Sequence, residues 1–290
     1  YSFQTYIHEI GHAIGLGHAG DYNGFARFGV DNHYANDSWQ ATVMSYFSQT
    51  DNPTINADEA FILTPMMADI LAIETLYGLS GDIRTEDTTY GVGSTAGGYY
   101  DDILDLTEAV AITIVDNGGV DTIDFSTATA AQVVSLEAET VSDVGGIRGA
   151  MGIARGTVIE EYRAGSGDDT VEGNSAANKL YGKGGNDSLF GSSGTDTLDG
   201  GNGADTLFGG SGSDYFHFDK SDGDDVVKDF VDDEDTLQFH QFYGTLTDAA
   251  SALGFATETD GNVTFDFGSD GIFTVEGTTK AALQNDIEIM

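Results

Sequence analysis

The pattern of hydrophobic and polar positions changes near residue 80. Before this point, apolar residues recur at spacings of three and four, which is typical of one face of a helix. A second helix is predicted over residues 65–77, with Thr64 as N-cap, Pro65 at the first helical position and Gly78 as the stop. The first helix is predicted over residues 3–14, with an apolar face formed by Phe3, Tyr6, Ile7, Ile10 and Ile14.

Beyond residue 80 the pattern consists of short β-branched or aromatic runs separated by Gly, Asn and Asp, which indicates strands and tight turns. A nine-residue period of the form G-G-x-G-x-D-x-U-x fits six successive units between Ala164 and His217. The eighth position of each unit is apolar, and we expect it to be buried: Val171, Leu180, Leu189, Leu198, Leu207 and Phe216. The sixth position carries Asp169, Asn178, Asp187, Asp196, Asp205 and Asp214.

Composition narrows the class of protein. Forty Gly against two Pro, with 40% hydrophobic residues, favours a turn-dense β architecture and excludes disorder and collagen. The formal charge of −39 argues against nucleic acid as a partner and predicts self-repulsion unless cations bind. A diffuse acidic surface, as in halophilic proteins, is the alternative, but the fixed spacing of Asp in Gly-rich segments favours specific cation sites.

Cysteine is absent, so metal ions are the available cross-links. We find no stretch of about 20 apolar residues, so no membrane span is expected. We also find no basic segment followed by an apolar one at the start, so export would use another signal. The chain opens directly on a helical pattern without Met or a cap, and we expect its amino terminus to be a cut within a longer protein.

The segment His8-Glu9-Ile10-Gly11-His12 places two imidazoles at i and i+4, on one face of a helix, with Glu9 beside them. Catalytic zinc requires three protein ligands and an open position. Gly15 can take a backbone turn that brings His18 round as the third ligand. The full match, H-E-x-x-H-x-x-G-x-x-H, is far more specific than a bare H-E-x-x-H and predicts a hydrolytic zinc site with Glu9 as general base.

With the turn Val43-Met44-Ser45-Tyr46, this motif resembles the metzincin clan of metallopeptidases, and within it the serralysins and astacins. The resemblance implies a secreted zinc-dependent endopeptidase that hydrolyses peptide bonds in proteins. It also implies that Tyr46 lies near zinc, as a fifth ligand that then stabilises the oxyanion, and that Met44 gives hydrophobic support beneath the site. Asp69, on the second helix, is a candidate hydrogen-bond partner of a ligating imidazole.

In the repeats, glycines permit positive φ and inward carbonyls, while the Asp carboxylate completes an all-oxygen cage suited to calcium. The unit beginning at Gly173 departs most from the pattern and is expected to bind calcium weakly or not at all. The candidate calcium ligands within the repeats are Gly165, Gly167, Asp169, Gly182, Gly184, Asp187, Gly191, Asp196, Gly200, Gly203, Asp205, Gly209, Gly212 and Asp214.

These units resemble the RTX repeats, in which two units form one turn of a right-handed parallel β-helix with calcium between turns. We expect the roll to fold only with calcium, after export. The serralysin resemblance implies further calcium ligands, although solvated turn acids are the alternative: Asp116, Gly118, Gly119, Asp121 and Glu160. It also implies a closing β-sandwich and type I secretion signal over residues 224–290, with the secretion machinery as a partner and an extracellular location.

The predicted fold is an α+β zincin-like catalytic half-domain over residues 1–80, followed by an all-β parallel β-roll and β-sandwich domain over residues 81–290, with the nonapeptide repeats at 164–217. The resemblance implies an upstream sheet, so the missing amino-terminal part is an expected partner. One alternative is a catalytically inactive fragment that acts only as a calcium-binding secretion and folding module. An RTX adhesin or toxin would explain the repeats but not the zinc motif. Surface or packing roles are expected for His33, His217 and His240.

Overall fold

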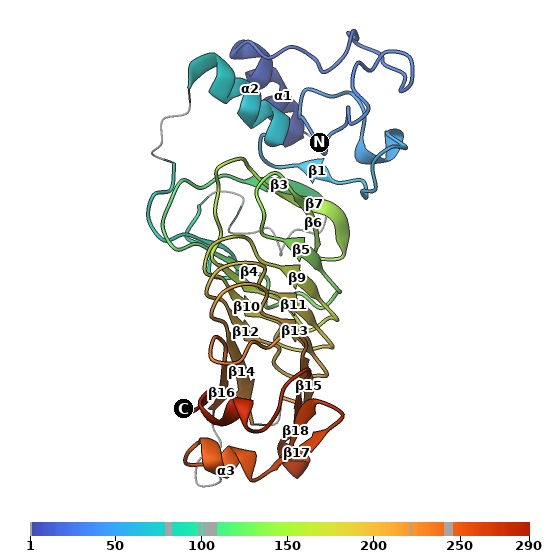
Figure 1. Cartoon of the computed structure of the whole chain (residues 1–290). Helices are drawn as coiled ribbons and strands as arrows, with labels where there is room; N and C mark the ends of the chain where they lie inside the picture. The colour runs from blue at the N-terminus through green and yellow to red at the C-terminus, as the bar shows by residue number, and fades with distance from the viewer. Residues whose placement is uncertain (1, 79–82, 98–99, 101–108, 221, 241–245) are drawn as a thin grey trace. The chain divides into compact units, whose positions relative to one another are not determined.

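The computed structural model describes residues 2–78, 83–97, 100, 109–220, 222–240 and 246–290 (Figure 1). The chain forms two compact units, the first comprising residues 1–119 and 138–158 and the second residues 120–137 and 159–290. The predicted domain boundary near residue 80 stays a prediction. The compact units divide elsewhere because strands after residue 80 pair with β1, which precedes it.

The first unit combines two helices with a small sheet in the order β1-β3-β7-β6. Parallel pairing joins β1 to β3 and β3 to β7, whereas β6 and β7 form an antiparallel hairpin. Its core is a cluster that includes Val43, Met44, Ile62 and Met66. The elements are α1 (Ser2–Ala13), η1 (Gln49–Asp51), β1 (Phe61–Ile62), α2 (Met67–Tyr77), β2 (Thr89–Gly91), β3 (Val110–Ile114), β6 (Val141–Val144) and β7 (Ile147–Ile153).

The first predicted helix agrees with α1 to within one residue at each end. Its predicted apolar face is wrong in part, because Tyr6 and Ile10 are 68% and 58% exposed. Ile7 packs against the buried cluster instead. The helix therefore buries a narrower stripe than its spacing of apolar residues predicts.

The second predicted helix starts two residues too early. Met66 is the N-cap of α2, and its N–H donates to the Asp69 carboxylate at 2.9 Å. The Thr64 hydroxyl is engaged elsewhere, because it accepts the N–H of Thr113 at 2.7 Å. The predicted stop at Gly78 is confirmed, with φ of 71° and an N–H that donates to Glu74.

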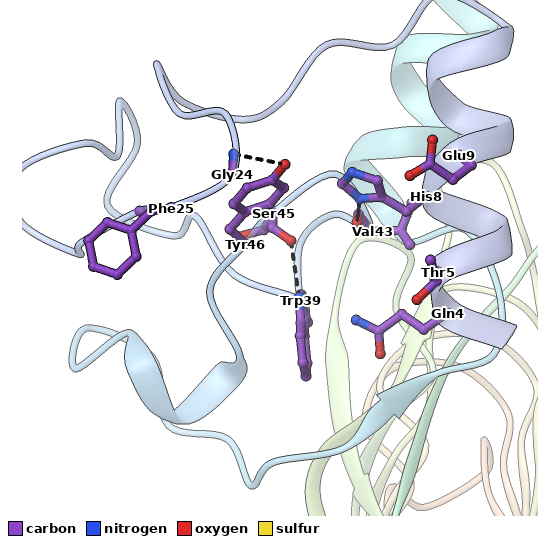
Figure 2. A pocket seen from close by; sticks show the side chains of 11 residues that line it. Gln4, Thr5, His8, Glu9, Gly24, Phe25, Trp39, Val43, Ser45 and Tyr46 are labelled. Carbon is purple, nitrogen blue, oxygen red and sulfur yellow. Dashed lines mark hydrogen bonds between the residues drawn. The ribbon is translucent and has the colours of Figure 1, made fainter. Parts of the chain in front are cut away.

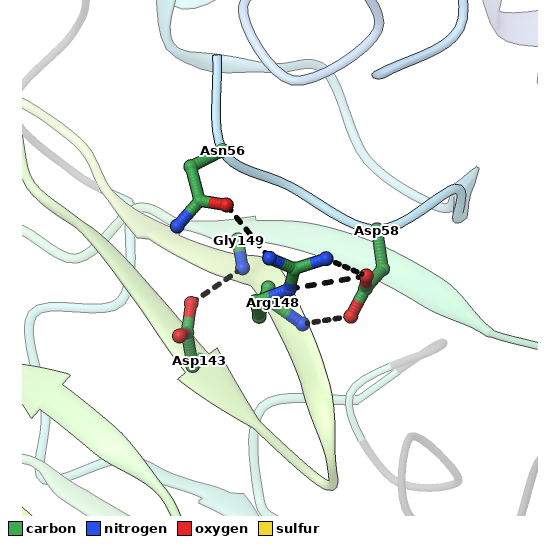
Figure 3. A network of polar contacts seen from close by, with 5 residues as sticks. All are labelled: Asn56, Asp58, Asp143, Arg148 and Gly149. Atoms are coloured by element: carbon green, nitrogen blue, oxygen red, sulfur yellow. Dashed lines mark hydrogen bonds and ion pairs between the residues drawn. The ribbon is translucent and has the colours of Figure 1, made fainter. Parts of the chain in front are cut away.

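The β6–β7 hairpin is tied to the segment before β1 by one arginine (Figure 3). Arg148 donates from Nε and Nη2 to Asp58 Oδ1 at 3.1 and 2.7 Å, and from Nη1 to Asn56 Oδ1 at 2.7 Å. The arginine lowers the pKa of the Asp58 carboxyl through these hydrogen bonds. Both side chains are substantially exposed, so the ion pair positions the hairpin more than it stabilises the unit.

The second unit is a roll of two facing rows of short parallel strands, drawn as a stack in Figure 1. Leu180 lies opposite Leu198 and Leu189 opposite Leu207, so each coil takes 18 residues, or two nonapeptides. One row is β4 (Thr122–Asp124), β8 (Glu161–Arg163), β10 (Lys179–Tyr181), β12 (Thr197–Asp199), β14 (Tyr215–Asp219), β16 (Thr236–His240) and β20 (Ile287–Ile289). The other is β5 (Val133–Ser135), β9 (Thr170–Glu172), β11 (Ser188–Phe190), β13 (Thr206–Phe208), β15 (Asp224–Val227), β19 (Ile272–Val275), β18 (Asn262–Asp266) and β17 (Ala256–Thr259).

The predicted core of the roll is confirmed, because the apolar eighth residue of every repeat is fully buried. After the last repeat the core becomes aromatic, with Phe218, Phe239 and Phe273 in mutual contact. Antiparallel pairing of β17, β18 and β19 follows. The unit also contains α3 (Ala249–Leu253), η3 (Gly268–Asp270) and η4 (Ala282–Gln284). The chain is thus mostly β, with a parallel β-roll and few helices. Among the described residues, no helix is long and apolar enough to cross a membrane.

Candidate functional site

The three histidines of the motif come together at the end of α1. His8 and His12 lie one turn apart on the helix, and the chain then leaves the helix through Gly15, whose φ of 97° is in the left-handed region. This turn, predicted from the sequence, brings His18 back to the other two. The ring centroids are 4.8 Å apart for His8 and His12, 4.6 Å for His12 and His18, and 5.3 Å for His8 and His18.

Each of these rings uses its Nδ1 for a backbone carbonyl. His8 Nδ1 lies 2.8 Å from the Val43 oxygen, His12 Nδ1 lies 3.0 Å from that of Leu16, and His18 Nδ1 lies 2.7 Å from that of Tyr22. A carbonyl can only accept, so each Nδ1 carries the proton and each Nε2 carries a lone pair. The Nε2 atoms of His12 and His18 are 3.0 Å apart. Two lone pairs at that distance repel unless a cation lies between them, so the donor set fits zinc.

The protonation state of His18 suits this role. Burial lowers the pKa of its imidazole, and the neighbouring His12 and His8 lower it further, although the hydrogen bond to Tyr22 acts in the opposite direction. The neutral imidazole is the form that ligates a metal ion.

The Met-containing turn lies directly beneath α1. Met44 is 2% exposed, and a Cβ placed on Gly11 would overlap its sulfur atom. Gly11 therefore allows the helix to approach the methionine. This contact agrees with the support role that the resemblance assigns to Met44.

Among the described residues, Asp69 makes no hydrogen bond to an imidazole, so that expectation is wrong. The carboxylate is buried and accepts hydrogen bonds from the Thr42 hydroxyl at 2.5 Å and the Val43 N–H at 2.8 Å. Val43 in turn accepts the His8 proton through its carbonyl. Asp69 thus acts on the backbone that orients His8, because α2 begins beside the turn and not beside the rings.

A cavity of about 490 Å³ opens beside the histidines, and Figure 2 shows its lining. Glu9 and His8 reach it from α1, and Tyr46 reaches it from the facing loop. The Tyr46 ring lies 5.8 Å from the His8 ring and 4.6 Å from the His18 ring, between centroids. Its hydroxyl accepts the N–H of Gly24 at 3.4 Å. The structure therefore brings the predicted base, the predicted ligand His8 and the tyrosine to one cavity, whereas His12 and His18 line a second one.

The repeat carboxylates form two ladders inside the roll. In one, Asp187 Oδ1 accepts the N–H of Asp169 and Asp205 Oδ1 accepts that of Asp187, each at 2.7 Å. In the other, Asp214 Oδ1 accepts the N–H of Asp196 at 2.9 Å. In Asp187, Asp196, Asp205 and Asp214 the second oxygen, Oδ2, is buried and has no hydrogen-bond partner within the described part of the chain. Orphaned buried carboxylate oxygens of this kind fit calcium, which takes oxygen ligands.

Burial makes these carboxylates weak acids in the absence of a cation. It raises the pKa of Asp187 and of Asp196 to about 7, and that of Asp205 to about 6. Neighbouring carboxylates add to the shift, Asp205 for Asp187 and Asp214 for Asp196. The Asp carboxylates within the ladders therefore repel one another unless protons or cations neutralise them.

The glycines serve two purposes, of which the sequence analysis named only one. Gly203 and Gly212 have φ of 147° and 135°, as expected. Among the predicted ligands within the repeats, the other glycines have ordinary φ, and all of these except Gly184 are needed for space. A Cβ at Gly182 or Gly200 would overlap the carboxylate of its own repeat, Asp187 or Asp205 respectively.

The unit that departs from the pattern replaces the carboxylate by an amide. Asn178 joins its ladder through its N–H, which donates to Asp196 Oδ1 at 2.7 Å, and its own Oδ1 accepts the N–H of Asn174 in the same repeat at 2.7 Å. Its Nδ2 donates to the Ile159 carbonyl at 3.0 Å. No charge is left orphaned there, in keeping with the prediction of weak or absent calcium binding, which stays a prediction.

Both ladders extend beyond the predicted repeats. Asp225 Oδ1 accepts the N–H of Asp205, and Asp235 Oδ1 accepts that of Asp214, at 3.0 and 2.9 Å. These two carboxylates lie outside the nine-residue pattern because the coils there lengthen to 20 and 21 residues. The signal that remains is an Asp two positions before a buried apolar residue, as in Asp225 with Val227 and Asp235 with Leu237.

The calcium ligands expected outside the repeats lie in different units. In the first unit, Asp116 is buried and accepts hydrogen bonds from the Tyr90 hydroxyl at 2.7 Å and the Gly118 N–H at 3.2 Å. Gly119 in the same unit has φ of 122°. In the second unit, Asp121 donates its N–H to Glu160 at 2.8 Å. A calcium site at these residues stays a prediction.

Among the remaining histidines, His33 lies on the surface and contacts Asp21 at 3.1 Å. His217 on β14 and His240 on β16 lie beside each other. Their ring centroids are 3.7 Å apart.

Residues 80–270 match the family model described as "Peptidase M10 serralysin C terminal". The chain is 41% identical over 186 residues to "Serralysin" from Photorhabdus luminescens, covering 62% of this chain and 38% of that protein. It is 42% identical over 172 residues to "Serralysin C" from Dickeya chrysanthemi, covering 58% of this chain and 36% of that protein. The solved extracellular lipase LipA from Serratia marcescens gives a TM-score of 0.39 at 17% identity over 63% of this chain and 34% of that one, too low to support a conclusion.

Proposed function

Because the chain belongs to the Peptidase M10 serralysin C-terminal family, we propose that it is the carboxy-terminal part of a secreted zinc-dependent endopeptidase. The matched segments span 38% and 36% of those two relatives, and the family model begins after the histidine cluster. The proposed activity therefore rests mainly on the site itself. The main support for this activity is that the three histidines lie close enough together to share a metal ion. In each ring the hydrogen bond from Nδ1 to a carbonyl leaves the Nε2 lone pair available as a ligand.

His8, His12 and His18 would hold the zinc ion, and Tyr46 would serve as a fifth ligand, as the resemblance to serralysins and astacins implies. When bound there, zinc polarises the scissile carbonyl and makes water acidic enough to ionise near neutral pH. Glu9 would accept the proton of the attacking water and pass it to the leaving amine, which requires a carboxylate that reaches the cavity but does not bind the metal. The Tyr46 hydroxyl would donate to the oxyanion. Around these residues, a zincin-like half-domain is the proposed architecture.

The roll would bind several calcium ions through the orphaned Oδ2 atoms of its aspartates. Calcium would neutralise the ladders, so the roll would remain unfolded where calcium is scarce and fold outside the cell. An extracellular location and passage through type I secretion machinery are part of the same proposal.

A preceding segment of the same protein is the proposed partner of the helical part. Within the first unit, Tyr6, Ile10, Leu76 and Tyr77 are 57–68% exposed on α1 and α2. Such a group of exposed apolar side chains favours coverage by another segment. It equally favours the second candidate function, in which this chain without that segment is inactive and acts only as a calcium-dependent secretion and folding module.

Hydrolysis of a fluorescent casein by the zinc-loaded chain in millimolar calcium tests the proposal. Glu9→Gln should retain one equivalent of zinc and lose turnover by about 10²-fold or more. Glu59→Gln, an exposed glutamate outside the cavity, is the matched control and should keep full turnover. His12→Ala should lose both zinc and turnover.

Equal turnover by the unsubstituted chain and Glu9→Gln would overturn the catalytic assignment. Bound zinc without any turnover would instead select the folding module as the function of this chain. Failure of the histidine cluster to retain zinc at all would reject both the metal assignment and the peptidase.

A further inference from the structure

We propose that His217, Asp219 and His240 form a further site for a divalent transition-metal ion, of the zinc type, on the outer face of the roll. This site belongs to the second unit and is separate from the histidines of α1. It concerns the stability of the roll and not the peptidase chemistry.

The strand geometry places all three side chains on one face. His217 and Asp219 alternate along β14 with Phe216 and Phe218, which are buried in the core, so both polar side chains point outward. His240 follows the buried Phe239 on β16 and therefore points the same way. The parallel pairing of the two strands sets Asp219 opposite His240.

The ligand atoms are close enough to share one ion. One atom from each of the three side chains lies within 4.8 Å of the others. His217 Nε2 is 4.0 Å from Asp219 Oδ1. Zinc with bonds of about 2.0–2.2 Å to nitrogen and oxygen spans such separations with little side-chain movement.

The same atoms have no other bonding partner. His217 Nε2, His240 Nε2 and Asp219 Oδ1 are all buried, and none makes a hydrogen bond to any residue that the structure describes. Buried polar atoms are normally satisfied, so three orphans aimed at one another need an explanation. A cation bound between them satisfies all three at once.

A second carboxylate lies beside one ring. Asp199 lies opposite His217 in the pairing of β12 and β14, and its Oδ2 is 3.4 Å from His217 Nδ1. An Nδ1 proton directed at a carboxylate leaves Nε2 as the metal-binding atom. The arrangement of carboxylate, histidine and open Nε2 is the one that supports metal ligands in proteins.

The ligand types decide which ion fits. Two imidazole nitrogens with one carboxylate oxygen suit zinc and its late first-row neighbours, whereas calcium prefers oxygen ligands. The site would join β14 to β16 where the coil lengthens from 18 to 21 residues and the regular repeat has ended. Zinc there would cross-link two successive coils in a region where the nonapeptide repeat no longer sets their register.

The test counts zinc in the full chain at saturating calcium, in a His8→Ala/His12→Ala background that removes the first cluster. This background should retain one zinc after gel filtration, and adding His240→Ala should remove it or weaken zinc affinity at least about 10-fold. Adding His33→Ala, a surface histidine, should change nothing. Substitution by Co²⁺ should give visible absorption bands that disappear with His240→Ala.

Far-UV circular dichroism in calcium shows whether each variant folds, and Asp219→Asn provides a second probe where His240→Ala does not. Equal zinc content with and without His240 and Asp219 would overturn the proposal, as would a background variant that retains no zinc. Because the first cluster is absent from these variants, neither result depends on the proposed peptidase.

Discussion

Each of the clustered histidines His8, His12 and His18 is oriented by a backbone carbonyl, so the geometry of the site depends on where the backbone runs. Helix α1 approaches the Met-containing turn closely at Gly11, whose missing side chain leaves room for the sulfur of Met44. A residue that is neither ligand nor base therefore sets the distance between the helix and the turn that carries Val43 and Tyr46.

We predict that Gly11→Ala destabilises the first unit. Within a helix, Ala is ordinarily more favourable than Gly by about 0.5–1 kcal/mol, but here the added Cβ overlaps buried Met44. The overlap should reverse the sign and cost about 1–3 kcal/mol. Thermal unfolding with zinc and calcium in excess measures the change.

Gly17→Ala is the control, because a Cβ at Gly17 meets nothing within 4 Å. This substitution should leave the unfolding temperature nearly unchanged. An unchanged or higher unfolding temperature for Gly11→Ala would show that the methionine moves aside readily and that the close approach does not constrain the site.

In the roll, we predict that Asp187→Asn removes one bound calcium. It should also reduce the difference between the unfolding temperature of the roll in calcium and that in chelator. The amide loses an anionic ligand, which weakens the calcium form, and it also removes a buried charge that opposes folding without calcium. Equilibrium dialysis gives the calcium count and thermal unfolding gives the difference. Asn178→Asp makes the reverse change in a matched position and should increase the difference in unfolding temperature between calcium and chelator. A decrease in that difference, as expected for Asp187→Asn, would contradict the prediction.

The sequence predicts residues well where one regular element sets their spacing. His8 and His12 share a helix, and Asp187 and Asp205 are one coil apart, so their meeting follows from the period alone. The hydrogen-bond partners of Asp69 could not be predicted correctly, because they depend on how α2 packs against the Met-containing turn. His217 and His240 could not be paired because the 21-residue coil between β14 and β16 follows no repeat.

At the scale of elements, the strands of the roll agree closely with the nine-residue repeat, whereas the start of α2 agrees less well with the local capping signals. The buried eighth position recurs through every unit, since each strand contacts only its neighbours in the stack. By contrast, the start of α2 is set by the Asp69 bond to Met66 and by the use of Thr64 in a tertiary contact. Local capping signals at Thr64 and Pro65 could not reveal that competition.

The ladders also predict an unusual pH dependence for the calcium-free roll. Burial raises the pKa of Asp187 and Asp196 to about 7, above the ordinary value of 3.8 that applies to the unfolded chain. Protonation therefore favours the folded state, so stability is greatest at low pH and is lost as pH rises through about 7. Circular dichroism in calcium-free buffer should show more folded roll at pH 5 than at pH 8.

General repulsion among acidic groups would give a trend of the same sign, so a variant must separate the two causes. The double variant Asp187→Asn/Asp196→Asn removes the two groups with the raised pKa values and changes the charge by only two of 39. It should flatten the dependence near pH 7. An unaltered pH profile would assign the effect to the overall charge and not to the ladders.

At the scale of the whole molecule, the charge of −39 raises the question of whether calcium acts at sites or only as a screening ion. The two mechanisms differ in what can replace calcium. Screening depends on ionic strength, and at about 1 M salt the Debye length is about 3 Å. Coordination depends on ion size and ligand number, and magnesium requires a stricter octahedral geometry than calcium.

We predict that about 5 mM calcium folds the roll, whereas about 1 M sodium chloride or an equal concentration of magnesium does not. The orphaned Oδ2 atoms are buried, where mobile ions cannot screen them, so only a coordinated ion neutralises them. Far-UV circular dichroism of the chelator-treated chain under the three conditions measures the outcome. Folding by sodium chloride would mean that the regular spacing of aspartates serves a diffuse acidic surface, and folding by magnesium would mean that the carboxylate cages do not select for the larger ion.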